Sequence, residues 1–178
     1  GIEGIRAASK MDYENFQFHQ DLSKFYSSIA VLQYDNKSAQ MDEEYLKLLN
    51  SLVNESNISV TQNSLSFQNW KVRLEVLKSL AKFIDIQDAA DKTADVLHKL
   101  APNNADNLIY LSDYYADLDT EKSLDLIKEA SDKNKNVNWI SLLYAKKLIS
   151  LNRNDEAETI LLNITSDQQK VNESAYQE

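Results

Sequence analysis

The sequence predicts an all-α protein built as a stack of antiparallel helical hairpins. Only two glycines and one proline occur among its 178 residues, whereas average usage would give about 21 of the two together. Sheet-rich folds need these residues at their tight turns. Apolar residues recur at helical spacing along nearly the whole chain, and a helix–loop–helix pattern occurs twice toward the C-terminus.

Three helices are expected in the first third of the chain, over residues 2–11, 15–34 and 41–57. The helix expected over 15–34 has an apolar stripe that includes Phe18 and Leu22, and the helix expected over 41–57 has one that includes Leu48 and Leu52. The stretch SNISVTQNS is the longest polar interruption and predicts a loop.

Two further helices are expected over residues 65–84 and 87–100. The first carries Trp70 and Leu74 on its apolar face, and the second carries alanines and leucines at helical spacing. Pro102 lies just beyond the second helix, where a proline commonly follows a helix end.

The remaining helices are expected over residues 105–118, 121–133, 137–151 and 155–164, with a last helix from residue 167 onward. Thr120 is the expected N-cap of the second of these, because its hydroxyl can accept from a free backbone N–H. The short loops between them place successive helices antiparallel to each other.

An internal repeat supports the hairpin prediction. The order large apolar, small, large apolar occurs at Leu111, Ser112 and Tyr115, and again at Tyr144, Ala145 and Leu148. A second small residue follows in each case, at Ser123 and Ala157. Two helices cross closely only where both carry small side chains, so each pair marks the crossing of one hairpin.

This pattern resembles the tetratricopeptide repeat, a helix–turn–helix of about 34 residues. The resemblance implies an α-α superhelix and a single repeat domain over residues 1–178. Its expected parts are divergent hairpins over 1–64, repeat-like hairpins over 65–104, 105–135 and 136–166, and a terminal helix over 167–178. Asp119 or Asn152 stands where the family has its turn glycine. Because the opening GIEGIRAASKMD resembles the end of an earlier helix, we expect the chain to be a piece of a longer protein.

A narrower resemblance concerns the sequence NWKVRLEVLKSLAKFIDIQDAADKTADVLHKLAPNN. Its Asn69, Trp70 and Arg73, the alanine pair at Ala89, and Pro102 resemble the repeat region of O-antigen ligase-type proteins of bacterial surface-polysaccharide assembly. The resemblance implies a domain attached to a membrane protein on its extracytoplasmic side. It carries over no glycosyltransfer residue.

Composition argues against catalysis and against cofactors. The chain has no cysteine, so thiolate nucleophiles and thiolate metal sites are excluded. Glycine-rich phosphate loops and the Gly-x-Ser-x-Gly elbow do not occur. We expect His19 and His98 to be packing or surface histidines, and most carboxylates to be solvated; a cation site at Asp113 and Asp117 is a minor alternative. The prediction is therefore a protein that is not an enzyme and has no cofactor or metal.

The charge of −9 and pI near 4.8 argue against nucleic-acid binding. No apolar run is long enough to span a bilayer. The expected partner is a protein or peptide, held on the concave surface that the first helices of the hairpins form in the resembled fold. By helical phase, the residues expected on that surface are Gln20, Lys24, Lys71, Glu75, Asp106, Ile109, Asp113, Asp117, Leu142, Lys146 and Ile149.

The predicted function is a non-catalytic protein-interaction scaffold, set in the membrane-protein context above. Two alternatives stay open. One is a cytoplasmic adaptor or co-chaperone of the same fold that binds peptide segments. The other is a glycan-binding module, in which Trp139 and neighbouring tyrosines stack on sugars.

Overall fold

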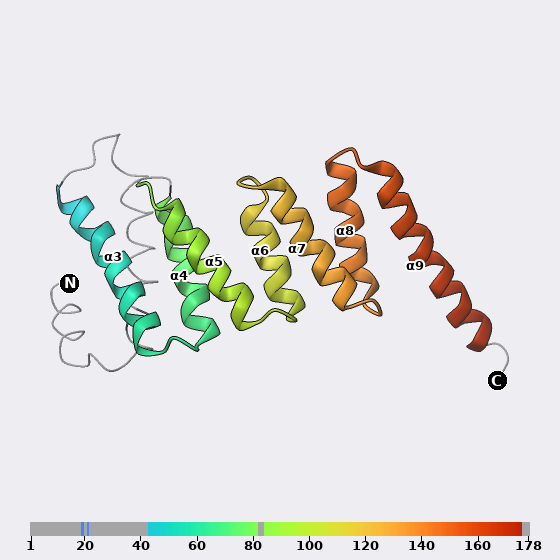
Figure 1. Cartoon of the computed structure of the whole chain (residues 1–178), viewed down its shortest axis with the longest axis horizontal. Helices are drawn as coiled ribbons and strands as arrows, with labels where there is room; N and C mark the ends of the chain where they lie inside the picture. Colours follow the sequence, from blue (N-terminus) through green and yellow to red (C-terminus); the bar gives the residue numbers. More distant parts are fainter. Residues whose placement is uncertain (1–18, 20, 22–42, 82–83, 176–178) are drawn as a thin grey trace. The chain divides into compact units, whose positions relative to one another are not determined.

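The computed structural model describes residues 19, 21, 43–81 and 84–175 (Figure 1). Within these ranges the chain forms helices joined by short turns. The helices are α3 (Glu43–Gln62), α4 (Phe67–Leu80), α5 (Gln87–Leu100), α6 (Ala105–Tyr115), α7 (Thr120–Lys133), α8 (Asn138–Ser150) and α9 (Asn154–Ala175). The helices predicted over 2–11 and 15–34 lie outside the described residues, apart from His19 and Asp21, which are helical.

The chain divides into two compact units, Gly1–Leu100 and Ala101–Glu178, and each is described by itself. In unit 1, α3 packs on α4 and α4 packs on α5. In unit 2, each of the helices α6 to α9 packs on the next one along the chain. Successive helices within a unit run antiparallel (Figure 1), as the prediction of stacked hairpins requires. The single domain over 1–178, with its hairpin boundaries, stays a prediction.

The first hairpin of unit 2 closes at two buried serines, Ser112 on α6 and Ser123 on α7. The Ser123 hydroxyl donates to the Ser112 carbonyl at 2.6 Å, and the Ser112 hydroxyl donates to the Ser123 carbonyl at 2.8 Å. These bonds require the two backbones to lie close together, which larger side chains would prevent. The small-residue crossing predicted from the repeat is therefore present.

The second hairpin of unit 2 has alanines at the equivalent places. Ala145 on α8 and Ala157 on α9 are fully buried in one apolar cluster with Tyr144 and Leu148. The same cluster contains Ile127 of α7, so the second hairpin shares its core with the first. Each hairpin alone would leave an apolar side in water, and stacking covers it.

Asn152 and Asp119, which stand where the repeat family has its turn glycine, reverse the chain in different ways. At the end of α8, Asn152 has φ 60, a left-handed conformation that asparagine tolerates better than most residues. The Arg153 N–H bonds the Leu148 carbonyl at 2.9 Å and the Asn152 N–H bonds the Ile149 carbonyl at 3.0 Å, which is the Schellman arrangement usually completed by glycine. Asparagine thus replaces the turn glycine here.

At the start of α7 the predicted N-cap is wrong by one residue. Asp119, in an extended conformation, accepts from the Lys122 N–H at 2.9 Å, and Thr120 is already helical. The α6 helix accordingly ends at Tyr115 rather than at residue 118, because the intervening residues turn the chain toward this cap.

The prediction of a loop over SNISVTQNS is wrong for most of that segment, since α3 continues to Gln62 and the turn begins at Asn63. Ser56, Ser59 and Val60 are buried. A small hydroxyl side chain can be buried when it bonds the helix itself, and Ser56 donates to the Val53 carbonyl at 2.8 Å. This segment is polar in sequence, yet it forms a helix with a buried side.

Two more boundaries differ. The α4 helix spans Phe67–Leu80 instead of 65–84, because Ser66 caps its start and Ala81 is its C-cap. The helices predicted over 155–164 and from 167 onward are one helix, α9. No glycine or proline interrupts that stretch, and the Thr165 hydroxyl bonds the Leu162 carbonyl within the helix at 2.9 Å.

The serine crossing gives a first prediction. Ser112→Leu should lower the free energy of unfolding by about 1–3 kcal/mol, because the added carbons force α6 and α7 apart. Urea unfolding followed by circular dichroism measures it. Lys128→Leu, on the exposed side of α7, is the matched control and should change the free energy by no more than about 0.5 kcal/mol. Equal effects of the two variants would contradict the crossing.

Candidate functional site

The candidate surface predicted from the sequence is only partly described. Gln20 and Lys24 lie outside the described residues. In unit 1, Lys71 is half-buried on α4, and Glu75 is exposed on the same helix. The other predicted residues belong to unit 2 and are treated together below.

On α6 the predicted carboxylates form an exposed acidic row. Asp106 and Asp113 lie on the solvent side of the helix, and Asp117 continues the row just beyond its end. Ile109 differs from them, because it is half-buried and packs against the cluster that contains Tyr144. Ile109 therefore packs between the two hairpins of unit 2.

On α8 the predicted residues are largely apolar and exposed. The exposed fractions are 47% for Leu142 and 50% for Ile149, and Lys146 between them is also exposed. Trp139, which stands on the same helix, is 51% exposed. Leu142 occupies the place in the second hairpin that Ile109 occupies in the first, yet within the described residues it lacks the cover that Ile109 has.

The Asn-Trp-x-x-Arg motif of unit 1 holds helices together. Asn69 is buried, and its amide donates to the Ser59 carbonyl of α3 at 2.9 Å. The Trp70 indole N–H donates to the Ser64 carbonyl at 2.7 Å, in the turn between α3 and α4. Both bonds cross from α4 to the preceding segment, so these residues fix how α4 follows α3.

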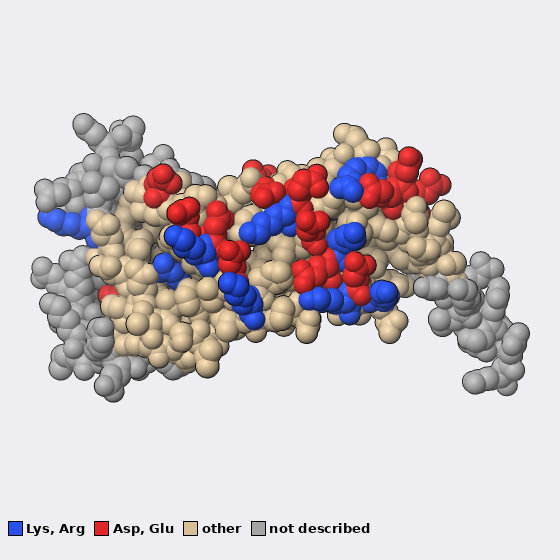
Figure 2. All heavy atoms as spheres, in the orientation of Figure 1, with Lys and Arg blue, Asp and Glu red and all other residues tan. Residues whose placement is uncertain are grey.

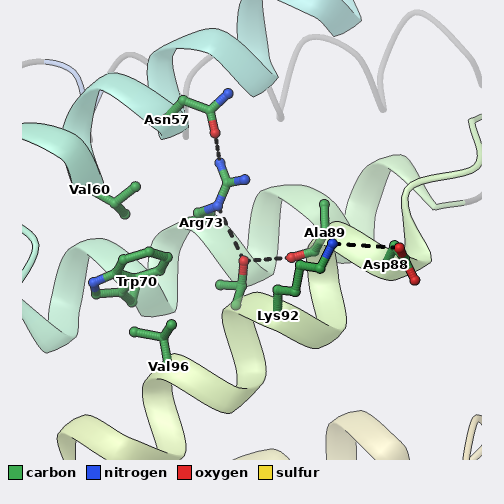
Figure 3. A pocket seen from close by; sticks show the side chains of 9 residues that line it. Asn57, Val60, Trp70, Arg73, Asp88, Ala89, Lys92 and Val96 are labelled. Carbon is green, nitrogen blue, oxygen red and sulfur yellow. Dashed lines mark hydrogen bonds and ion pairs between the residues drawn. The ribbon is translucent and has the colours of Figure 1, made fainter.

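Arg73, the last residue of the motif, bonds to both neighbouring helices. Its Nη1 donates to the Asn57 side-chain carbonyl (Figure 3) and to the Ser56 hydroxyl of α3 at 3.2 Å. Its Nε donates to the Thr93 hydroxyl of α5 at 3.2 Å. Burial lowers the pKa of this guanidinium from its ordinary value, because leaving water disfavours the charged form.

The two histidines have no arrangement that indicates chemistry. His19 is buried, and its Nδ1 lies 2.6 Å from the Glu55 carboxylate of α3. His98 lies half-buried in the last turn of α5. Across the described part of the chain, no three His, Cys, Asp or Glu side chains gather in a way that could hold a metal ion.

Charges of both signs cover the face seen in Figure 2. Acidic and basic side chains are interspersed there over α5 and α7. On α5, Lys92 pairs with Asp88 at 3.6 Å, and on α7, Lys133 pairs with Glu129 at 2.6 Å. The exposed sides of α5 and α7 therefore carry charges of both signs, whereas the exposed row on α6 is acidic.

Comparisons with solved structures agree with the fold. A crystal structure of MamA matches with a TM-score of 0.61 at 14% identity, over 97% of this chain and 89% of that one. A second crystal structure of MamA protein gives a TM-score of 0.60 at 15% identity, over 95% and 81%. A structure of MamA 41-end from Desulfovibrio magneticus RS-1 gives 0.56 at 11% identity, over 93% and 82%.

These likenesses confirm the all-α, tetratricopeptide-like helical repeat fold. At such low identity they show the fold alone. No protein-family model and no curated protein sequence matches the chain. None of the helices that the structure describes combines the length and the apolar character needed to cross a membrane.

The role of the motif gives a second prediction. Asn69→Leu should lower the free energy of unfolding by about 1–2 kcal/mol, because the bond from α4 to the Ser59 carbonyl is lost. Gln68→Leu, at the neighbouring exposed position, is the control and should cost no more than about 0.5 kcal/mol. Thermal and urea unfolding of the two variants measure the difference. A neutral Asn69→Leu would mean that the motif does not secure α4.

Proposed function

We propose that the chain is a non-catalytic scaffold that binds a protein or peptide partner on the exposed side of α6 and α8. One observation carries the proposal. Trp139, Leu142 and Ile149 are each about half exposed on a helix whose opposite side is fully buried. Single exposed apolar residues are ordinary, but several on one helix face indicate an interaction surface.

The opposite side of α8 makes this exposed face rigid. Tyr144, Ala145 and Leu148 hold the helix in the core, so its backbone is fixed before any partner arrives. A preformed surface loses little conformational entropy on binding. Covering the exposed apolar groups then contributes about 25 cal/mol for each Å² removed from water.

The charges favour a partner that is basic as well as apolar. Asp106, Asp113 and Asp117 are exposed on α6, and the chain as a whole carries a charge of −9. An amphipathic segment with leucine-like anchors and lysines or arginines would complement such a surface. We therefore propose a basic amphipathic peptide segment as the partner.

A third prediction tests this surface. The double variant Leu142→Ser with Ile149→Ser should fold as the parent does, because both side chains are exposed. Peptides selected from a displayed random library on the parent chain should be amphipathic and basic, and should bind the double variant at least tenfold more weakly. Surface plasmon resonance measures the affinities, with Leu65→Ser as the control, since Leu65 is exposed in unit 1.

Two results would contradict the proposal. One is a failure of the library to yield peptides that bind the parent saturably. The other is selected peptides whose affinity is unchanged in the double variant, since these would bind elsewhere. A loss that is equal in Leu65→Ser would indicate a general effect of removing surface leucine.

For the setting of the scaffold, we propose the soluble repeat domain of a larger bacterial membrane protein of surface-polysaccharide assembly. The support is the resemblance carried by Asn69, Trp70 and Arg73, together with the repeat fold. The open reading frame around this chain tests it. Several apolar spans before Gly1 are expected, whereas a frame with none would favour the cytoplasmic adaptor instead.

A second candidate function rests on Trp139 alone. An exposed indole, 51% accessible, offers the flat apolar face on which sugars stack. A fourth prediction follows: if the face binds glycan, polysaccharide should change the tryptophan fluorescence of the parent, and Trp139→Ala should abolish that change. A change on adding basic peptide but none on adding polysaccharide would leave only the peptide-binding scaffold.

A further inference from the structure

A pocket of about 430 Å³ lies among α3, α4 and α5 of unit 1, and the residues that line it all belong to these helices. Figure 3 shows side chains from α3, α4 and α5 around it. One side is apolar, formed by Val60, Trp70 and Val96. Pockets that hold small organic groups commonly exceed about 300 Å³ and combine apolar walls with a few polar groups.

Among the polar residues that line this pocket, Arg73 is a half-buried cation. All of its acceptors within the described residues are neutral: the Ser56 and Thr93 hydroxyls and the Asn57 amide oxygen. These take the Nε–H and both protons of Nη1, so the two protons of Nη2 have no acceptor in the described part of the chain. Figure 3 shows the bond to Asn57 on one side of the guanidinium.

Among the described residues Arg73 has no anionic partner, which is unexpected for a half-buried cation in this protein. The chain has 28 carboxylate side chains against 19 lysines and arginines. Buried charges are ordinarily paired, because losing water costs free energy that neutral partners only partly replace. Arg73 leaves one donor nitrogen for an anion that the described chain does not supply.

The rim of the pocket is accessible and carries a second cation. Lys92 and Asp88 line it, and their side chains are 79% and 98% exposed. They lie 3.6 Å apart, which at this exposure is a weak pair. Lys92 can therefore turn toward an arriving anion, while its link to Asp88 costs little to break.

We propose that this pocket binds a carboxylate attached to a short apolar group, with the carboxylate on Arg73 Nη2 and the apolar group against Trp70 and Val60. A charged acceptor forms a stronger bond with guanidinium than a neutral one. The ligand is either a free aliphatic carboxylic acid or the C-terminal residue of a partner chain, since both present this chemistry. The site is independent of the surface proposed on unit 2.

Tryptophan fluorescence tests the proposal directly. The chain has two tryptophans, so Trp139→Phe leaves Trp70 as the reporter in the pocket wall. The probes are hexanoate with hexanol as its neutral counterpart, and a pentapeptide ending in leucine with either a free carboxylate or an amide. We expect a saturable change with the carboxylates and at least tenfold weaker binding of the neutral forms.

Three further substitutions in this background separate the contributions. Arg73→Gln keeps a donor but removes the charge, and should weaken carboxylate binding at least tenfold. Lys92→Gln should weaken it a few-fold, with a smaller dependence on salt. Lys78→Gln is the control and should leave binding unchanged, because Lys78 is exposed on α4, the helix of Arg73, and lies outside the pocket lining. Tighter binding of the peptide than of hexanoate would identify a chain terminus as the ligand.

Arg73→Gln could also unfold unit 1, because Arg73 joins three helices. A second measurement therefore uses the parent chain: hexanoate should shift the NMR signal of the Trp70 indole N–H, and hexanol should not. No saturable change with either carboxylate would overturn the proposal. Equal responses to charged and neutral probes, or full binding by a folded Arg73→Gln variant, would overturn it as well and leave Arg73 as a helix-packing residue only.

Discussion

The close approach of paired helices at small side chains is the constraint on which the rest of unit 2 depends. Ser112 with Ser123, and Ala145 with Ala157, are fully buried. At these points nothing larger fits between the backbones, so each hairpin has one permitted crossing. The large apolar residues one turn away then meet the next hairpin, and the stack follows from the crossing.

This packing divides each first helix into two sides with different tasks. On α8 the side with Tyr144 is used for the core, and the side with Leu142 and Trp139 is left in water. In unit 1 a charged side chain, Arg73 of α4, bonds to both neighbouring helices. A repeat fold by itself does not specify a function, so any function depends on these particular side chains.

Much of the fold could be predicted from the sequence because helical periodicity and the scarcity of glycine act locally. The α5 helix begins and ends at the predicted residues, Gln87 and Leu100. One error arose where polar residues have a role that only tertiary packing reveals, at the buried Ser56 and Ser59 of α3. The Arg73 pocket could not be predicted, since it requires knowing that residues 57 and 93 flank residue 73. The sequence feature that could have pointed to this pocket is an arginine within an apolar helical pattern.

The most direct test of this account is hydroxyl-radical footprinting of the free chain, which measures how accessible individual side chains are in solution. The account predicts fast oxidation of Trp139 and Leu142 and strong protection of Tyr115 and Leu148, which lie on the buried sides of their helices. Protection of Trp139 and Leu142 in the free chain, or fast oxidation of Tyr115 and Leu148, would contradict the division of each first helix into a core side and a solvent side.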